Sequence, residues 1–357
     1  MESVRLKQDI ITDTVRDWIL KGKYTPGEKL PTDSELADRF LVNRCTVAAG
    51  LKRLVEENLL DRAPKRGSVV KRQDKIPCTN AVALITATSG ELYSKFTARI
   101  NRELLKRDLY PVLMDESLHN DYDEVIKFMH QFIRKSHPYG SLILGDHIPY
   151  EELKKAPYCL FKTVFLLRYH HFEEFPNAYY ALTDYEDMGR RIAEYFAERN
   201  VKRILYPAVD EIVYKGAWSS MQVTLMGHIK KYAEKLGIGL DESLFWRLHS
   251  GAPIDVVLPA AIESSKESTG IFCWSDSYCT MRVLPVIRNM GLDPRHDFKL
   301  LGNFNTIHSA EYGFDTIDHR VEDIAEIGVK MLTGDITEKK ILLPVEFVYR
   351  KKIIKER

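Results

Sequence analysis

Two short apolar patterns with helical spacing meet across a four-residue turn within residues 30–54, which read LPTDSELADRFLVNRCTVAAGLKRL. Thr32 and Glu35 have the spacing of a capping box, so a helix is predicted to begin near Asp33. Asn43 is a good N-cap for the next helix. Two helices joined by three or four residues form a helix-turn-helix, and this junction therefore constrains the start of the chain strongly.

The segments on either side complete a small domain. Residues 4–24 carry apolar side chains at helical spacing and predict an earlier helix. The run LLDRAPKRGSVVKR predicts two short strands around a basic turn at residues 64–67. The residues expected to be buried in the three helices are Leu6, Ile10, Ile11, Val15, Trp18, Ile19, Leu36, Ala37, Phe40, Val47, Leu51, Leu54 and Val55.

Arg44 stands in the first turn of the third predicted helix, where a helix that only packs has no need of a long cation. In a helix-turn-helix, the N-terminal residues of the second helix reach base edges in the major groove. A guanidinium matches guanine O6 and N7, and Thr46 can bond a phosphate or a base. The alternative is that Arg44 is a solvated helix residue and that Lys65 and Arg66 form only a polar turn.

Charge is distributed unevenly along the chain. The net charge of all 357 residues is +1, but residues 1–72 carry 15 Lys and Arg against 11 Asp and Glu. A basic head on a mildly acidic remainder fits a polyanionic partner for the head alone.

Three motifs of the head carry a family resemblance. They are G-x-Y-x-P-G-x-x-L-P at residues 22–31, S-E-L-A at 34–37 and N-R-x-T-V at 43–47, followed by an R-G before two valines. This head resembles the winged-helix domain of the GntR family of bacterial transcription regulators. The resemblance covers about 65 residues and departs from the family at Ala48 and Ser34, where the family often carries charged side chains.

The resemblance implies DNA contacts at Arg44, Thr46 and the wing glycine Gly67. The departures imply an operator that differs from the usual family consensus. Together with their neighbours, the residues expected at the DNA are Thr32, Ser34, Arg44, Cys45, Thr46, Lys65, Arg66 and Gly67.

The remainder of the chain alternates predicted strands with predicted helices, which indicates an α/β protein with parallel sheets. At about 280 residues it exceeds one comfortable doubly wound sheet, so two lobes are expected. A P-loop, a G-x-G-x-x-G after a strand and a G-x-S-x-G are all absent from the sequence. The apolar runs lie at residues 81–86, 110–114, 140–145, 163–167, 203–207, 270–274 and 299–304.

Four segments of this body, 181–207, 270–306, 313–334 and 341–352, follow in order the entry to the second lobe, a strand–Asp–helix–strand unit, the return to the first lobe and a final strand. In this order the body resembles the sugar-sensing domain of lactose-repressor-type regulators, which are related to periplasmic sugar-binding proteins. The predicted organisation is therefore a winged-helix head at 1–72, a linker at 73–78 and a two-lobed effector-binding and dimerisation domain at 79–357.

In such folds ligands bind beyond the carboxyl ends of the strands. Sugars need aromatic faces for their C–H side and forked polar groups for their hydroxyls. Each candidate has a structural alternative, because a tryptophan near a strand end is commonly core and an aspartate before a helix is commonly an N-cap, as we expect for Asp184. The effector candidates are Tyr93, Asp146, Arg168, Trp218 (in a predicted loop), Gln222, Trp274, Asp276, Asn303 and Asn305.

Two departures from the lactose-repressor pattern bear on the effector. An arginine of the family falls at Thr224, and an acidic position falls at Phe304. These departures favour a neutral or deoxy sugar over a sugar phosphate, with Arg168 as the counter-argument. The resemblance to arabinose regulators favours L-arabinose or L-fucose.

Several other classes of function fit the sequence poorly. Five cysteines without a C-x-x-C pair argue against a disulfide framework and a zinc site, and predict small buried hydrophobes. The pair at residues 170–171 is a weak metal candidate, because adjacent histidines rarely coordinate together. Acidic residues near the start argue against a signal peptide, and long apolar stretches that could span a membrane are missing.

We therefore expect a cytoplasmic homodimeric repressor of a sugar-utilisation operon, which binds double-stranded operator DNA and a sugar and needs no cofactor. The alternatives are a sugar- or nucleotide-acting enzyme, a regulator with a non-sugar effector, an activator, and a regulator with an aminotransferase-like body that binds pyridoxal phosphate.

Overall fold

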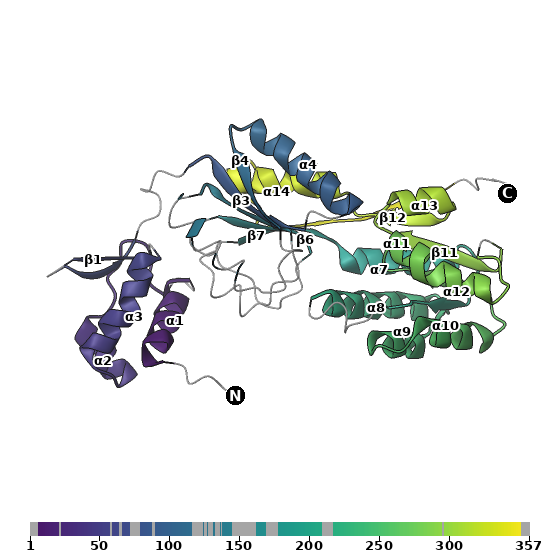
Figure 1. Cartoon of the computed structure of the whole chain (residues 1–357), viewed down its shortest axis with the longest axis horizontal. Helices are drawn as coiled ribbons and strands as arrows, with labels where there is room; N and C mark the ends of the chain where they lie inside the picture. Colours follow the sequence, from purple (N-terminus) through teal and green to yellow (C-terminus); the bar gives the residue numbers. More distant parts are fainter. Residues whose placement is uncertain are drawn as a thin grey trace.

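The computed structural model describes residues 6–20, 23–57, 59–63, 66–71, 79–87, 90–115, 124, 127, 131–132, 136, 138–144, 162–168, 178–208, 217–294 and 296–350, with only the backbone of residues 20 and 217–220. Figure 1 shows a small N-terminal head followed by two larger lobes in a row. The proposed linker at 73–78 lies outside the described residues.

The head is built from three helices and a strand pair, namely α1 (Lys7–Leu20), α2 (Asp33–Phe40), α3 (Arg44–Glu56), β1 (Leu60–Ala63) and β2 (Gly67–Val70). The capping box is confirmed, because the Thr32 N–H donates to the Glu35 carboxylate at 2.7 Å and the Glu35 N–H donates to the Thr32 hydroxyl at 3.3 Å. Asn43 caps α3 by accepting from the Thr46 N–H at 2.8 Å. The strands pair antiparallel, as the predicted hairpin requires.

The core of the head differs from the prediction at its edge. Leu6 is 57% exposed and Ile10 is 43% exposed, whereas Ile11 and Val15 are buried. The reason is that α1 begins only at Lys7, and that it crosses α3 through Ile11 and the neighbouring Thr12. The predicted burial of Val47, Leu51 and Leu54 on α3 is confirmed.

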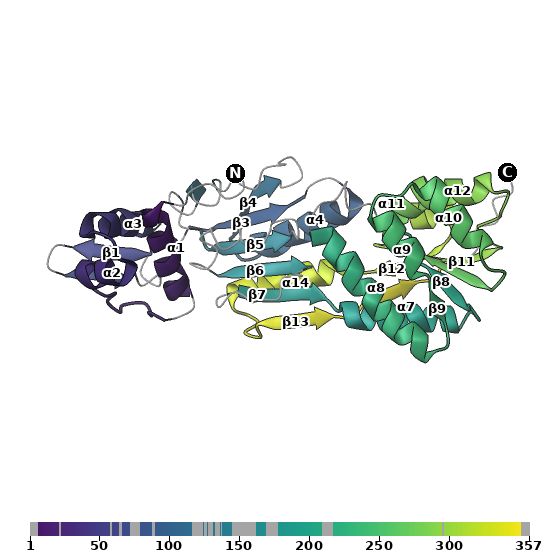
Figure 2. The same cartoon turned by 90° about the horizontal axis from the view of Figure 1, so that it is seen from below.

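Lobe 1 is a parallel sheet whose described strands lie in the order β13-β7-β6-β5-β3-β4 (Figure 2). Helices α4 (Glu91–Leu105) and α14 (Val321–Thr333) pack together against it. The strands are β3 (Ala81–Thr86), β4 (Tyr110–Asp115), β5 (Gly140–Leu144), β6 (Thr163–Leu167), β7 (Ala178–Thr183) and β13 (Lys340–Leu343).

Lobe 2 has the described strand order β14-β12-β11-β10-β8-β9. Its strands are β8 (Arg203–Leu205), β9 (Gly239–Leu240), β10 (Thr269–Phe272), β11 (Phe298–Asn303), β12 (Asp315–Asp318) and β14 (Glu346–Val348). Its helices are α7 (Tyr185–Ala197), α8 (Ala217–Lys235), α9 (Glu242–His249), α10 (Ile254–Glu263), α11 (Asp276–Tyr278), α12 (Leu284–Asn289) and α13 (Ile307–Tyr312), with a π-helical turn at Cys279–Val283.

The chain passes between the lobes at β7–α7, at β12–α14 and at β13–β14. The last passage corrects the prediction of one final strand over 341–352. Pro344 has no N–H for a sheet ladder, and the chain leaves lobe 1 there to add β14 to lobe 2. Because β14 runs antiparallel to β12, the expectation of purely parallel sheets also fails at this edge.

Two glycines on the paired helices α7 and α8 have opposite surroundings. A Cβ at Gly189 would lie 2.5 Å from the Cβ of His228 and 3.0 Å from the backbone nitrogen of Ile229. Gly227, in the same helix pair, is exposed and has no atom within 4 Å of such a position. Only Gly189 is therefore needed for the close approach of the two helices.

We expect Gly189→Ala to lower the free energy of unfolding by about 1–3 kcal/mol, because the two helix backbones must move apart. Gly227→Ala should raise it by about 0.5–1 kcal/mol through helix propensity. Urea unfolding of both variants followed by circular dichroism measures the difference. Equal effects of the two substitutions would contradict the assigned helix contact.

Candidate functional site

The exposed end of α3 presents Arg44 and Cys45. The Arg44 Nη2 donates to the Ser34 hydroxyl at 2.8 Å, which ties α3 to α2 on the outer face of the head. A guanidinium has five N–H donors, so this bond leaves others for a base edge or phosphate. Ser34, where the family resemblance places a charge, thus orients the arginine next to it. Cys45 corrects the expectation of buried cysteines, whereas Cys273 and Cys279 are buried as predicted.

Thr46 and Thr32 are both held by local hydrogen bonds. The Thr46 hydroxyl lies 2.9 Å from the Asn43 Oδ1, and the Thr32 hydroxyl lies 2.9 Å from a Glu35 carboxylate oxygen. Each hydroxyl keeps acceptor capacity for a partner, but its proton is used within the head. Thr32 therefore serves the start of α2 in this structure.

The wing contains Arg66 and Gly67, both exposed, while Lys65 lies outside the described residues. Gly67 has φ 81° and open space around it, which is the backbone conformation that favours glycine in a tight turn. Arg66 is 4.0 Å from the Asp61 carboxylate, a surface pair that contributes little stability.

Sequence reasoning missed two features of this face. Arg62 on β1 donates to the Asp33 carboxylate at 2.5 Å and to the Ala48 carbonyl oxygen at 3.5 Å, so it connects the wing to both α2 and α3.

Leu41, in the turn before α3, has φ 52° and is 85% exposed. A surface hollow of about 570 Å³ lies beside it, lined by Lys7, Ala37, Asp38, Leu41, Val42, Asn43 and Thr46. Nothing in the sequence around Leu41 indicates that this apolar turn residue would be exposed beside a hollow.

In the body, strand ends of the two lobes meet at Arg168 and Phe304. Arg168 follows β6 of lobe 1 and is buried, and its guanidinium carbon lies 5.4 Å from the ring centroid of Phe304, which follows β11 of lobe 2. A cation over an aromatic face is attracted by the ring quadrupole. This contact brings one predicted effector residue of lobe 1 to the candidate site.

Phe304 is the centre of an aromatic cluster. Its ring stacks on His319 with centroids 4.7 Å apart and meets Trp274 edge-to-face at 6.1 Å. Phe304 has φ 86°, a conformation that costs free energy for a bulky residue and is held here by its N–H bond to the Ile317 carbonyl. Strain of this kind commonly marks a functional site.

A directed hydrogen-bond chain crosses between the lobes at the same place. Asn303 Nδ2 donates to the Trp274 carbonyl at 3.0 Å, so its Oδ1 must accept, at 2.8 Å, from His319 Nε2–H. His319 Nδ1 lies 3.0 Å from the Thr183 hydroxyl at the end of β7. In a neutral ring this nitrogen accepts a hydrogen bond from the Thr183 hydroxyl, so every donor in this hydrogen-bond chain has one acceptor.

His319 is buried, and burial lowers its pKa from 6.5 to about 3, with a further decrease from the positive charge of Arg168. The ring is therefore neutral throughout the physiological range, as the hydrogen-bond directions require. Sequence reasoning did not single out His319, because nothing in its local pattern distinguishes it from a surface histidine.

Asp276 is enclosed by lobe 2 itself. Its carboxylate accepts from the Thr306 N–H at 2.7 Å, the Thr306 hydroxyl at 3.2 Å and the Thr316 hydroxyl at 2.7 Å. Burial raises the pKa of Asp276, while these hydrogen bonds act in the opposite direction. The carboxylate therefore ties together the loops that follow β10 and β11.

Asn305 is also engaged in the protein, since its Nδ2 donates to the Asp318 carboxylate at 2.8 Å and its Oδ1 accepts from Arg350. Asp184 is confirmed as the N-cap of α7, with its carboxylate accepting from the Asp187 N–H at 2.9 Å.

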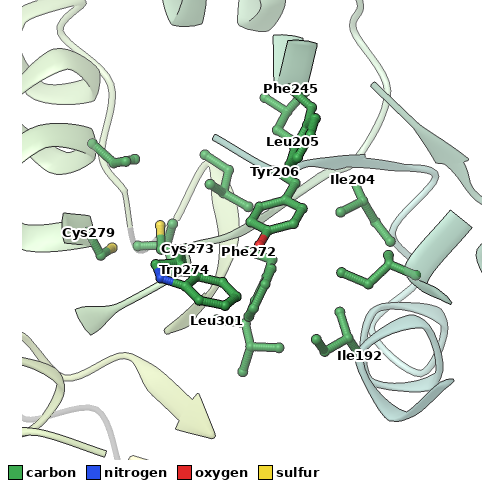
Figure 3. Packing of buried hydrophobic residues seen from close by; sticks show 14 of the residues in the cluster. Ile192, Ile204, Leu205, Tyr206, Phe245, Phe272, Cys273, Trp274, Cys279 and Leu301 are labelled. Carbon is green, nitrogen blue, oxygen red and sulfur yellow. The ribbon is translucent and has the colours of Figure 1, made fainter. Parts of the chain in front are cut away.

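The other predicted effector residues are placed as follows. Trp274 is buried in the core of lobe 2, beside Cys273 (Figure 3). Tyr93 is half-buried in the first turn of α4, and Gln222 is buried on α8. Trp218 belongs to α8 and not to a loop as predicted, because the helix already begins at residue 217. Asp146 and the side chain of Trp218 lie outside the described residues.

Among the residues that the structure describes, no group of three or more His, Cys, Asp or Glu side chains is arranged to hold a metal ion. None of the helices in the same part of the chain has both the length and the apolarity to cross a membrane.

The neutral state of His319 predicts a pH dependence of stability. Between about pH 6.5 and pH 3 the unfolded chain binds a proton that the folded ring excludes, so stability falls as pH falls through this window. The slope from this one group is about 1.4 kcal/mol per pH unit. His319→Gln keeps one donor and one acceptor and should remove this share of the slope. Urea unfolding of both proteins from pH 7 to pH 4.5 measures it, and parallel curves would contradict the burial of a neutral ring.

Comparisons with known proteins agree with the two parts of the structure. Residues 7–70 match the model of bacterial regulatory proteins of the gntR family. The chain is 23% identical to an arabinose metabolism transcriptional repressor of Geobacillus stearothermophilus, over 98% of this chain and 95% of that protein.

Solved structures match the fold of the body. A transcriptional regulator CelR–cellobiose complex superposes with a TM-score of 0.62 at 17% identity, covering 90% of this chain and 99% of the other. The Lac repressor bound to ONPG superposes with a TM-score of 0.58 at 15% identity, covering 86% of this chain and 89% of the other. The chain is therefore similar to transcription regulators in both parts: a DNA-binding domain of the gntR type at residues 7–70 precedes a two-lobed body that has the fold of these solved structures.

Proposed function

We propose that this chain represses a sugar-utilisation operon, and that a neutral monosaccharide bound between the lobes changes its affinity for the operator. The observation that carries the proposal is the contact of Arg168 from lobe 1 with Phe304 from lobe 2. The head, in addition, exposes Arg44 at the start of α3. One part of the molecule thus suits DNA, and the other has polar and aromatic groups where two lobes join.

At the DNA, Arg44 reads a base edge in the major groove, with Ser34 holding its guanidinium. The exposed wing at Arg66 and Gly67 lies along the backbone. A palindromic operator requires a two-fold protein, so the working form is a homodimer in the cytoplasm, where the operator is accessible. In this proposal the head spans residues 1–72, and the body, residues 79–357, forms the dimer contacts.

The effector is proposed to be neutral because the two departures from the lactose-repressor pattern, Thr224 in place of an arginine and Phe304 in place of an acid, each remove a charge from the site. Arg168, whose guanidinium lies over the Phe304 ring, is the counter-argument. Asp276, Asn303 and Asn305 are used to hold the strand ends, so in this proposal they shape the site and Arg168 and Trp274 contact the sugar. The likeness to an arabinose metabolism repressor supports a pentose such as L-arabinose, or the related L-fucose.

We expect Arg44→Ala to weaken binding to the specific operator by about 1–3 kcal/mol, because a forked base contact is lost. Lys52→Ala is a matched control, since it removes a cation from the same helix whose side chain is 77% exposed. Fluorescence anisotropy with operator and scrambled duplexes measures both. Unchanged operator affinity in Arg44→Ala would exclude this assignment of the reading helix.

We expect a pentose or deoxyhexose to raise the thermal unfolding midpoint in a concentration-dependent way, because it binds only the folded body. The corresponding sugar phosphates should have little effect. Arg168→Ala should lose the response while keeping operator binding in the absence of sugar. A sugar phosphate as the strongest ligand would overturn the argument from Phe304, and a flat response to the whole panel would indicate a non-sugar effector.

A further inference from the structure

A second contact joins the lobes away from the crossovers. Glu91 opens α4 at the carboxyl end of β3 in lobe 1, and Ile307 opens α13 beyond β11 in lobe 2. The Glu91 carboxylate accepts from the Ile307 N–H at 2.8 Å. Figure 1 shows α4 reaching from lobe 1 toward α13. The two residues are 216 positions apart, so only the placement of the lobes brings them together.

The bond is charge-assisted, and an ion pair with Lys95 orients the Glu91 carboxylate. Lys95, one turn along α4, pairs with the same carboxylate at 2.7 Å, and the Glu91 side chain is 35% exposed. Burial on its own would raise the pKa of Glu91, but the Lys95 and Ile307 bonds outweigh it and lower the pKa. The carboxylate is therefore charged at neutral pH, and a bond to an ionised acceptor is stronger than one between neutral groups.

This contact differs in kind from the His319 chain. Thr183 and His319 lie in segments where the backbone itself passes between the lobes. Glu91 and Ile307 belong to segments that do not cross between the lobes. In this structure their bond is present together with the contact between Arg168 and Phe304.

We propose that Glu91 is a catch between the lobes, which favours the arrangement with the strand ends together and thereby strengthens effector binding. The inference rests on the proposed function, since it assigns regulation to the same effector site. A ligand that touches both lobes favours the same arrangement, so catch and ligand support each other thermodynamically. Loss of the catch lowers the fraction of molecules ready to bind, and the apparent affinity falls in proportion.

The structure offers two independent ways to remove the bond. Glu91→Ala deletes the acceptor. Ile307→Pro deletes only the donor, because residue 307 is the first residue of α13, where proline is tolerated. The preceding residue, Thr306, has φ −93° and ψ 172°, which suits a position before proline. Lys95→Met is the matched control, since it removes the ion pair and keeps the bond between lobes.

Titration of each full-length variant with L-arabinose, or with the strongest ligand of the sugar panel, tests the proposal. Glu91→Ala and Ile307→Pro should each weaken sugar affinity about three- to tenfold. The double variant should be no weaker than either single one, because both remove the same bond. Lys95→Met should stay within about twofold of the wild type. Unchanged or tighter sugar binding in both single variants, or additive losses in the double variant, would overturn the catch.

A measurement without sugar separates the catch from the proposed function. Amide hydrogen exchange of the peptide containing residue 307 should be faster in Glu91→Ala than in the wild type or in Lys95→Met. Equal exchange would show that Glu91 does not hold this amide, whatever the sugar results. If the wild type binds none of the sugars, the proposed function fails, and the exchange result still decides whether the catch exists. Should Ile307→Pro fold poorly, Glu91→Ala and its control carry the test alone.

Discussion

One buried and uncharged imidazole, that of His319, connects the strand ends of the two lobes. His319 Nδ1 accepts a hydrogen bond from the Thr183 hydroxyl of lobe 1, and its Nε2–H donates to Asn303 Oδ1 of lobe 2. Asn303 Nδ2 in turn donates to the Trp274 carbonyl. A protonated ring would have to reverse or break the Thr183 bond, and it would lie beside the charge of Arg168. Burial thus keeps the ring neutral, and the Asn303 acceptor selects the tautomer that carries its proton on Nε2, so that His319 links strand ends of both lobes.

The head follows a different logic, because its geometry is decided by neighbours in sequence. The capping box at Thr32 and the N-cap at Asn43 set the first turns of both helices of the reading motif. A bidentate ion pair of Arg16 with Glu57, at 3.0 and 2.6 Å, then anchors α1 to the end of α3. Arg44 and Arg66, which are proposed to contact DNA, are exposed, but the elements that carry them are fixed by buried or capped contacts.

This contrast explains how much the sequence could predict. Caps, turn residues and helical spacing act over a few residues, so the starts of α2 and α3 and the pairing of β1 with β2 were predicted correctly. The effector site depends on which polar groups are already used within the fold. Asp276, Asn303 and Asn305 look like sugar ligands in sequence, but their side-chain hydrogen bonds reach residues 13 to 45 positions away. His319 and Glu91 were missed for the same reason, since each acquires its role only from the other lobe.

An effector that binds among such groups has few polar contacts to choose from, and this restricts how it can act. In the proposed function, a sugar gains little by replacing the bonds of Asp276 and Asn303, because each replaced bond would leave a buried partner unsatisfied. In the same proposal, its gain comes from groups that meet across the lobes, such as Arg168 and the aromatic cluster at Phe304. Binding energy drawn from both lobes acts directly on their relative placement. In this architecture, affinity for the effector and control of the lobe arrangement therefore arise from the same contacts.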